Sequence, residues 1–170
     1  EMTAPIDVAA LSGQSSFQNR RGIRNGSLNA IAGAAWTTED VTSIATYSAS
    51  NNVTLPGVAN VANIKVGSLV IGTGVGREVY VTATNLGAGT VTISQPLYAA
   101  VGTRSYTFRR FKYMLDFSGF SLLSRFEIED VEFNSNGVGP AVMLPLSGNT
   151  QRFVSCTFTR PQDRGISSPG

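Results

Sequence analysis

A segment that recurs after 25 residues constrains this chain more than any other feature. Residues 128–134 read IEDVEFN, and residues 153–159 read FVSCTFT. The apolar positions of the two copies coincide, because three residues of the first fall on three of the second: Ile128, Val131 and Phe133 on Phe153, Cys156 and Phe158. Repeats of this length stack as the coils of a solenoid, in which equivalent side chains form ladders through the core.

The two copies resemble successive coils of a right-handed parallel β-helix. Each copy ends with a phenylalanine followed by a polar residue, and the segment between them, NSNGVGPAVMLPLSGN, predicts a turn, a short strand over Ala141–Leu144 and a second turn. About three repeats are needed for a stable stack. We therefore expect residues 113–170 to be the start of such a β-helix, truncated here, and the whole fold to be all-β.

Residues 51–112 predict a compact β-module of short strands and turns. The strand-like runs are VTL, SLVIG, EVYVTAT, TVTIS and SYTFRRF, and turn residues separate them. Strict alternation places Val79 and Val81 on one face of their strand, and Val91 and Ile93 on one face of the next. The run NLGAG at residues 85–89 predicts a hairpin loop, because glycine adopts positive φ there.

Three glycines at alternate positions, Gly72, Gly74 and Gly76, raise the question of a phosphate-binding loop. A dinucleotide fingerprint places its third glycine where this chain has Arg77, and it leads into a helix, whereas EVYVTAT has the pattern of a strand. No Gly-Lys-Ser/Thr follows, so a Walker loop is excluded as well. The run predicts a glycine-rich turn between two strands, and we expect no cofactor.

The absence of histidine and the single cysteine exclude several enzyme and metal classes. Without histidine the chain builds no Ser-His-Asp triad, no Cys-His pair and no histidine metal site, and one cysteine forms no internal disulfide. Cys156 is expected as an inward core residue, because free cysteine is among the most buried residue types. We therefore expect no metal ligand and no reactive thiol.

Charge and hydropathy predict a soluble protein that neither enters a membrane nor binds nucleic acid. The formal charge is only +2. Apolar runs stay far below the roughly 18 residues of a membrane span, and the start EMTAPIDVAALSGQ lacks a signal-peptide pattern. One basic cluster is interleaved with aromatics, but period two directs the aromatics into a core. It comprises Arg104, Arg109, Arg110 and Lys112, with Tyr106, Phe108 and Phe111.

Residues 1–50 have the weakest pattern of the chain. Gly, Asn, Ser and Ala dominate, and Arg20, Arg21 and Arg24 form a basic cluster. The only helix signal is TTEDVTSIATY at residues 37–47, where a threonine can cap and two acids suit the first turn. We expect an irregular attachment segment that is ordered by a partner or a neighbouring copy.

The β-module resembles one that recurs in bacteriophage tail fibres and tailspikes. The resemblance is carried by IKVGSLVIGTGVGREVYVTATNLGAGTVTISQPLYAAVGTRSYTF. The C-terminal RFVSCTFTRPQDRGISSPG is similar to segments in the spikes of gene-transfer agents and tailed phages. The resemblance implies a homotrimeric tail or head spike, anchored to other particle proteins by its N-terminal region. Its β-helix would meet a host-surface polysaccharide, so we expect this chain to be the N-terminal part of a longer protein.

The alternative function is a polysaccharide depolymerase, and acidic side chains are its only catalytic candidates. These are Asp116, Glu127, Glu129, Asp130, Glu132 and Asp163. Paired carboxylates hydrolyse glycosidic bonds, and an arginine beside an acid suits a lyase; Arg125, Arg152, Arg160 and Arg164 are available. Outward side chains on strands are normally solvated, so we assign no catalytic residue.

Aromatic side chains are the candidates for stacking on sugar rings. They are Trp36, Tyr80, Tyr98 and Tyr113. Single aromatics are more often core or interface residues. A secreted bacterial β-helix adhesin is a third possible class, which the missing signal-peptide pattern disfavours.

Overall fold

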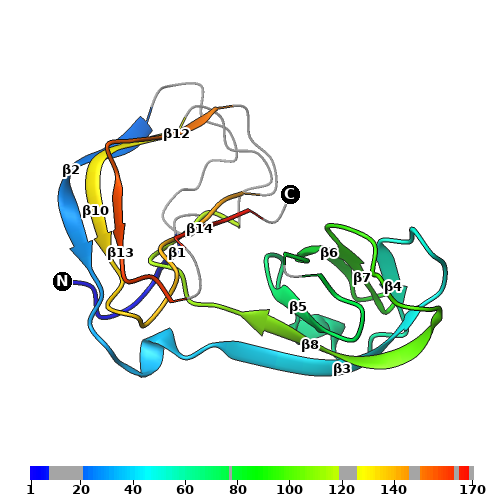
Figure 1. Cartoon of the computed structure of the whole chain (residues 1–170). Coiled ribbons are helices and arrows are strands. Elements are labelled where there is room, and N and C mark those ends of the chain that lie inside the picture. The colour runs from blue at the N-terminus through cyan, green and yellow to red at the C-terminus, as the bar shows by residue number, and fades with distance from the viewer. Residues whose placement is uncertain (8–20, 77, 119–125, 146–149, 163–164, 169–170) are drawn as a thin grey trace. The chain divides into compact units, whose positions relative to one another are not determined.

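The computed structural model describes residues 1–7, 21–76, 78–118, 126–145, 150–162 and 165–168. These residues form an all-β protein, as predicted (Figure 1). Their only helices are the short 3-10 turns η2 (Ala34–Trp36) and η3 (Val61–Asn63), and none is long and apolar enough to span a membrane. The chain divides into two compact units, which we call unit 1 (Glu1–Thr37 and Lys112–Ser168) and unit 2 (Thr38–Phe111).

Unit 1 consists of two parallel sheets. In the larger sheet β10 (Phe126–Asn134) pairs with β2 (Arg21–Asn29), and on its other edge with β12 (Gln151–Val154) and β13 (Thr157–Thr159). The smaller sheet has the order β1 (Ile6–Asp7), β9 (Leu115–Asp116), β11 (Val142–Met143) and β14 (Ile166–Ser167). Strand β11 lies within the predicted strand at residues 141–144.

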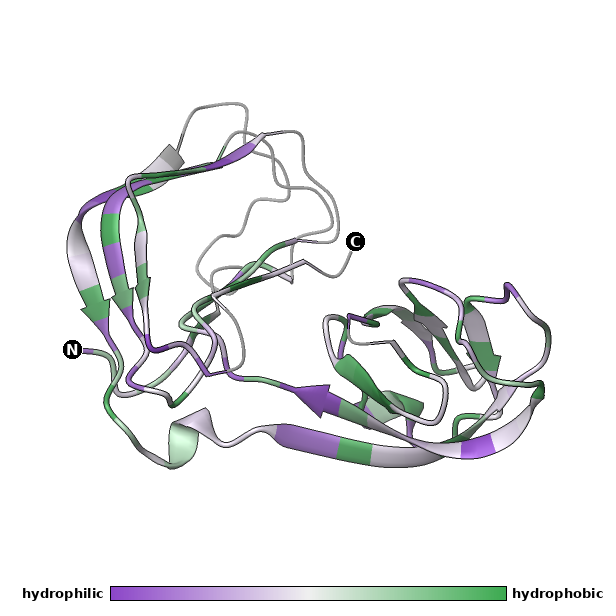
Figure 2. Ribbon diagram, in the orientation of Figure 1, coloured by the Kyte–Doolittle hydropathy of each residue, from purple (hydrophilic) through white to green (hydrophobic). Residues whose placement is uncertain are grey.

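The predicted repeat of 25 residues is confirmed by the strand register. Ile128 is the partner of Phe153, and Phe133 is the partner of Phe158. Hydrophobic and hydrophilic residues alternate along β10, which places one set of side chains in the core (Figure 2). The rings of Phe133 and Phe158 stack with centroids 5.1 Å apart and an interplanar angle of 6°.

The expectation that residues 1–50 are irregular is wrong for two long segments. Strand β2 is nine residues long and repeats the same ladder, with Ile23 beside Ile128 and Leu28 beside Phe133. Its glycines and asparagine resemble a loop in sequence, but Gly22 lies where β2 approaches β10 closely. An alanine Cβ at Gly22 would collide with the carbonyl oxygen of Glu127.

The helix signal at residues 37–47 is also overturned, because the segment forms strand β3 (Glu39–Tyr47). It pairs antiparallel with β8 (Gly102–Arg110) over its whole length. Four β-branched residues favour the strand: Val41, Thr42, Ile44 and Thr46. The two acids expected in a first helical turn lie opposite arginines instead, with Asp40 facing Arg109.

Unit 2 contains two three-stranded antiparallel sheets. One has the order β3, β8, β5 (Leu69–Gly72), and the other has β4 (Thr54–Pro56), β7 (Thr90–Ile93), β6 (Val81–Asn85). The β6–β7 hairpin is the predicted one, and the alternating valines and isoleucine are buried as predicted. They share one hydrophobic cluster with the aromatic side chains of Tyr106 and Phe108.

The two ends of unit 2 lie side by side, because Glu39 at the start of β3 pairs with Arg110 at the end of β8. Within unit 1, β1 pairs with β9 and β2 pairs with β10. The segments before and after unit 2 in the sequence are therefore neighbours in the parallel sheets. We call the parts of unit 1 that contain β2, β10 and β12–β13 its first, second and third coil-like segments. Unit 2 is an excursion of the chain between the first and the second, which differs from the three consecutive segments that we predict from the sequence.

Candidate functional site

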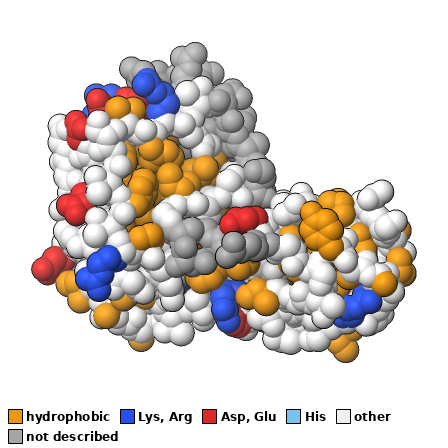
Figure 3. All heavy atoms as spheres, in the orientation of Figure 1, with side chains coloured by type: hydrophobic (Ala, Val, Ile, Leu, Met, Phe, Trp, Pro, Cys, Tyr) orange, Lys and Arg blue, Asp and Glu red, His pale blue; other side chains and the backbone are white. Residues whose placement is uncertain are grey.

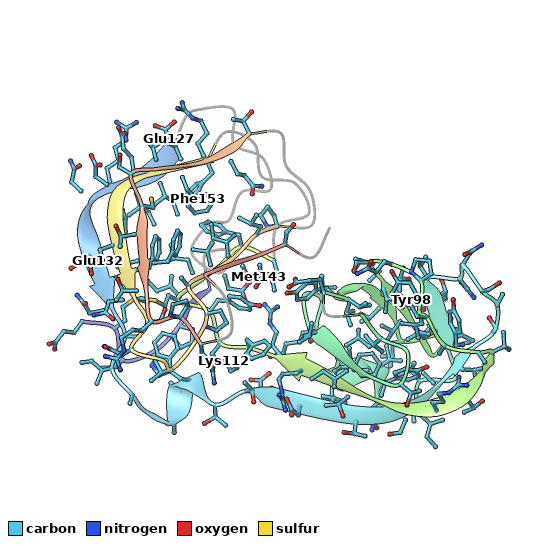
Figure 4. The ribbon with its side chains drawn as sticks, in the orientation of Figure 1. Tyr98, Lys112, Glu127, Glu132, Met143 and Phe153 are labelled. Atoms are coloured by element: carbon cyan, nitrogen blue, oxygen red, sulfur yellow. The ribbon has the colours of Figure 1, made fainter. Side chains whose placement is uncertain are left out.

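Two of the candidate carboxylates, Glu127 (labelled in Figure 4) and Glu129, lie on β10 beside arginines of the neighbouring strands. Glu127 accepts a hydrogen bond from Nη2 of Arg24 on β2, 3.1 Å away, and one from Nη1 of Arg152 on β12, 3.3 Å away. Nε of Arg24 also lies 3.1 Å from the Glu129 carboxylate. Arginine and glutamate thus alternate across three strands.

This ladder of charges holds the strands together rather than presenting a free acid and base. Each Glu127 oxygen is engaged by a guanidinium, and the side chain is only 9% exposed, whereas both arginine side chains are about half exposed. Charge-assisted hydrogen bonds of this kind are about twice as strong as neutral ones. A general acid or base must reach substrate with its own oxygen. Glu127 therefore serves as a cross-strand partner, and Glu129, whose side chain is 36% exposed, pairs with Arg24.

The remaining carboxylates are dispersed. Glu132 and Asp130 are exposed on β10. Asp116 accepts hydrogen bonds from the amide and the hydroxyl of Ser118, at 3.0 and 2.7 Å, which stabilises a local turn. Asp163, Arg125 and Arg164 lie outside the described residues. Among the described ones, no group of three or more acidic or cysteine side chains could hold a metal ion.

Cys156 occupies the inward position that the repeat predicts. Its side chain packs against the unit 1 core, and Sγ lies 3.4 Å from the carbonyl oxygens of Ile128 and Val154. The thiol is half-buried between adjacent coil-like segments. It packs as a small core residue.

Of the four aromatic candidates for sugar stacking, three are buried and one is exposed. Trp36 lies in the unit 1 core, and Tyr113 of the same unit is almost fully buried. Tyr80 is buried in unit 2. Tyr98 is 84% exposed. It belongs to the segment between β7 and β8 of unit 2, labelled in Figure 4. Tyr98 is therefore the aromatic that a ligand can reach.

The backbone on both sides of Tyr98 is held in place by hydrogen bonds. The Tyr98 amide donates to the carbonyl of Gly74 at 2.7 Å. The buried Tyr47 hydroxyl donates to the carbonyl of Leu97 at 3.1 Å, and Nη1 of Arg104 donates to the carbonyl of Ala100 at 2.6 Å. The loop that presents the exposed ring is thus held at three residues, Leu97, Tyr98 and Ala100.

The glycine run explains how this loop fits against the rest of unit 2. Gly74 has φ +75°, and a Cβ there would overlap the Cβ of Ala99 and lie 2.7 Å from its backbone, so the turn approaches the loop more closely than any other residue would allow. A Cβ at Gly76 would lie 3.6 Å from Cε2 of Tyr98. The run therefore forms the predicted turn after β5, and this turn supports the Tyr98 loop.

Asp40 and Arg109 form a bidentate ion pair between β3 and β8. Nε of Arg109 lies 2.9 Å from Oδ1 of Asp40, and Nη2 lies 2.7 Å from Oδ2. These hydrogen bonds, with the attraction of the charges, hold the pKa of Asp40 below its ordinary value, although partial burial opposes the shift. The same bonds raise the pKa of Arg109.

Replacing Asp40 with asparagine is expected to lower the stability of unit 2 by less than about 1 kcal/mol at pH 7, because both side chains are more than one-third exposed. The folded-state pKa of Asp40 is depressed, so its contribution is complete above the unfolded-state pKa and disappears as the pH falls through the folded value. Exchange rates of β3 and β8 amides, corrected for pH, should differ between the proteins at pH 7 and converge near pH 2. An equal difference at both pH values would contradict this account.

Known proteins provide no template for either unit. Comparison of the chain with protein-family models, curated proteins and solved structures found no match.

Proposed function

We propose that this chain belongs to a structural, receptor-binding spike or fibre of a phage-like particle, with unit 1 as the start of a right-handed parallel β-helix. The observation that carries the proposal is one strand pattern that occurs three times within the chain, in parallel strands that lie side by side. Strands β2, β10 and β12–β13 run parallel with equivalent residues in register. Coils stacked in this way build a stiff shaft that grows by adding identical layers.

A repeated bend in the backbone supports the same proposal. Asn25, Asp130 and Ser155 occupy equivalent ladder positions and have φ values of 55°, 54° and 51°. L-residues rarely adopt this left-handed conformation, and small polar side chains tolerate it best. A fixed corner in each of three successive segments is what a chain needs in order to close one coil and start the next.

Strands β12 and β13, at the edge of the larger sheet, have apolar side chains that are only partly covered. Phe133 on β10 is fully buried, whereas Phe153 and Phe158, on β12 and β13, are half-buried. Hydrophobic side chains gather on the face of unit 1 that is turned toward the viewer in Figure 3. This face supports the proposal that further β-structure stacks against β12 and β13.

The proposed mechanism is multivalent adhesion. Three copies would form the spike, the N-terminal region would attach it to other particle proteins, and the shaft would meet a host-surface polysaccharide. Weak sugar contacts become effective when several copies bind at once. The engagement of Glu127 and Glu129 by arginines favours adhesion over a depolymerase that uses these acids.

The mass of the intact native protein tests this proposal. Native mass spectrometry should give a trimer, and immobilised polysaccharide from the host surface should retain it. A monomer that such polysaccharide does not retain would contradict the proposal. Release of new reducing ends or unsaturated sugars during retention would favour the depolymerase instead.

Substitutions at Asp130 test the repeated bend. Asp130→Val should destabilise unit 1 by about 1–2 kcal/mol, because a β-branched residue is strained at φ 54°. Asp130→Gly should change stability by less than about 0.5 kcal/mol, since glycine adopts this conformation freely. Urea unfolding followed by fluorescence of Trp36, the single tryptophan, reports on unit 1. Equal stability of the two variants would contradict the left-handed corner.

A further inference from the structure

We propose that unit 2 carries its own carbohydrate-binding site, in which Tyr98 stacks against the face of a neutral pyranose ring. The inference deepens the adhesion part of the proposed function and rests on it. It differs in placing a sugar contact on the excursion rather than on the coil-like segments of unit 1.

Exposure separates Tyr98 from the other tyrosines of unit 2. Tyr47, Tyr80 and Tyr106 are buried, with no more than 1% of each residue exposed. Tyr98 is 84% exposed although its neighbour Leu97 is buried. The segment thus inserts one side chain into the core and leaves the next outside. An aromatic ring with a polar tip in this position is suited to a ligand that is apolar on one face and polar at its rim.

The loop is arranged before any ligand arrives. Its backbone accepts or donates hydrogen bonds before, at and after the ring: Leu97 with Tyr47, Tyr98 with Gly74, and Ala100 with Arg104. The ring edge lies beside Gly76, where even an added Cβ would make only an ordinary van der Waals contact with it. Little conformational entropy is then lost on binding, which is the usual cost for a site on a loop.

The charges of unit 2 favour a neutral ligand. Lys65 pairs with Glu39 at 3.0 Å, Arg109 pairs with Asp40, and Arg104 is turned onto the carbonyl of Ala100. Arg110 is buried. Nucleic acids and anionic polymers bind mainly through exposed cations along a groove, and the described cations of this unit are engaged in these contacts or buried.

Polar groups accompany the ring. Thr73 is exposed beside Gly74, whose carbonyl accepts the hydrogen bond of the Tyr98 amide. Ser94, whose Oγ accepts a hydrogen bond from the Tyr80 amide, is exposed four residues before Tyr98 in the sequence. Hydroxyl groups at the edge of an aromatic platform can hydrogen-bond to sugar hydroxyls while the ring covers the apolar face. An exposed ring with hydroxyl-bearing residues on the same and the adjoining segment favours a saccharide over a purely apolar ligand.

The test is a titration of the isotope-labelled full chain with cellohexaose, maltohexaose and laminarihexaose, followed by amide NMR signals. At least one hexasaccharide should shift signals of residues 73–76 and 97–101. Tyr98→Ala should raise its Kd about tenfold, the upper range for aromatic stacking. Tyr98→Phe should raise it about twofold through loss of the hydroxyl. Leu86→Ala, which removes an exposed apolar side chain elsewhere in unit 2, should leave it unchanged.

Several results would overturn the inference. They are no shift with any hexasaccharide, equal Kd for wild type and Tyr98→Ala, tighter binding of oligothymidylate, or a change of native mass in Tyr98→Ala, which would make the ring a subunit contact. Dispersed spectra of the variants exclude misfolding as a cause. If the wild type is a trimer retained on host polysaccharide but Tyr98→Ala binds the hexasaccharides as tightly as the wild type, the inference fails and the proposed function stands. A monomeric wild type that is not retained would remove the proposed function itself.

Discussion

Truncation of Phe133 to alanine is expected to destabilise unit 1 by about 3–5 kcal/mol. The side chain is completely buried, and its ring stacks on Phe158 of the next coil-like segment. Its strand partner on the other side is Leu28 of β2. Removal of the ring therefore leaves a cavity that three neighbouring strands line, and they cannot all move in to fill it.

Urea unfolding monitored by Trp36 fluorescence measures this effect, with two variants for comparison. Phe133→Leu keeps most of the volume and should cost less than about 1.5 kcal/mol. Phe158→Ala removes the other ring of the stacked pair but from a half-buried position, so about 1–2 kcal/mol is expected. Equal losses for Phe133→Ala and Phe158→Ala would show that β10 is not the middle strand of the ladder.

Substitution of Gly22 by alanine is the second large expected effect, at about 3 kcal/mol, the upper range for overpacking. A Cβ at this position would overlap the carbonyl oxygen of Glu127. The obstacle is the backbone of β10, not the end of a flexible side chain. The strands must separate locally, and this weakens both the ladder hydrogen bonds and the Arg24–Glu127 ion pair.

Gly26→Ala is the matched control in the same strand. A Cβ there would meet no atom within 4 Å. Both substitutions replace one glycine, so each lowers the conformational entropy of the unfolded chain by the same amount. Gly26→Ala should therefore be neutral or stabilise by a few tenths of a kcal/mol. Similar destabilisation by both would contradict the pairing of β2 with β10.

The parts of the fold that could be predicted depend on local patterns. The repeat of Ile128 and Phe133 in Phe153 and Phe158 is visible because both copies keep large apolar residues at the same spacing. The alternation in the hairpin around residues 85–89 is visible for the same reason. Strand pairing at short sequence separation follows from such patterns.

The first coil-like segment could not be predicted, because its partner is 105 positions away in the sequence. Ile23 and Leu28 have the same spacing as Ile128 and Phe133, but Gly26 stands where the other copies have Val131 and Cys156. Unit 2 interrupts the period between them. An alignment of residues 21–29 with residues 126–134 would have found this segment, because both share the spacing and have a small polar residue at the bend.

The roles of the candidate site residues could not be predicted from the sequence for a similar reason. The sequence offers Glu127 as an acid, but its partners Arg24 and Arg152 are 103 and 25 residues away. Tyr98 and Tyr80 look alike in the sequence, and only tertiary packing leaves one exposed and the other buried. Burial depends on contacts that local periodicity does not contain.

Distances between spin labels at positions 27, 132 and 157 test the central claim, the stacked order of β2, β10 and β13. These residues are exposed and in register, and the native Cys156 would be replaced by serine. The account predicts similar short distances for the 27/132 and 132/157 pairs, and a 27/157 distance about 5 Å longer, one strand spacing. A broad, long distribution for 27/132 would show that the N-terminal segment is not part of the stack.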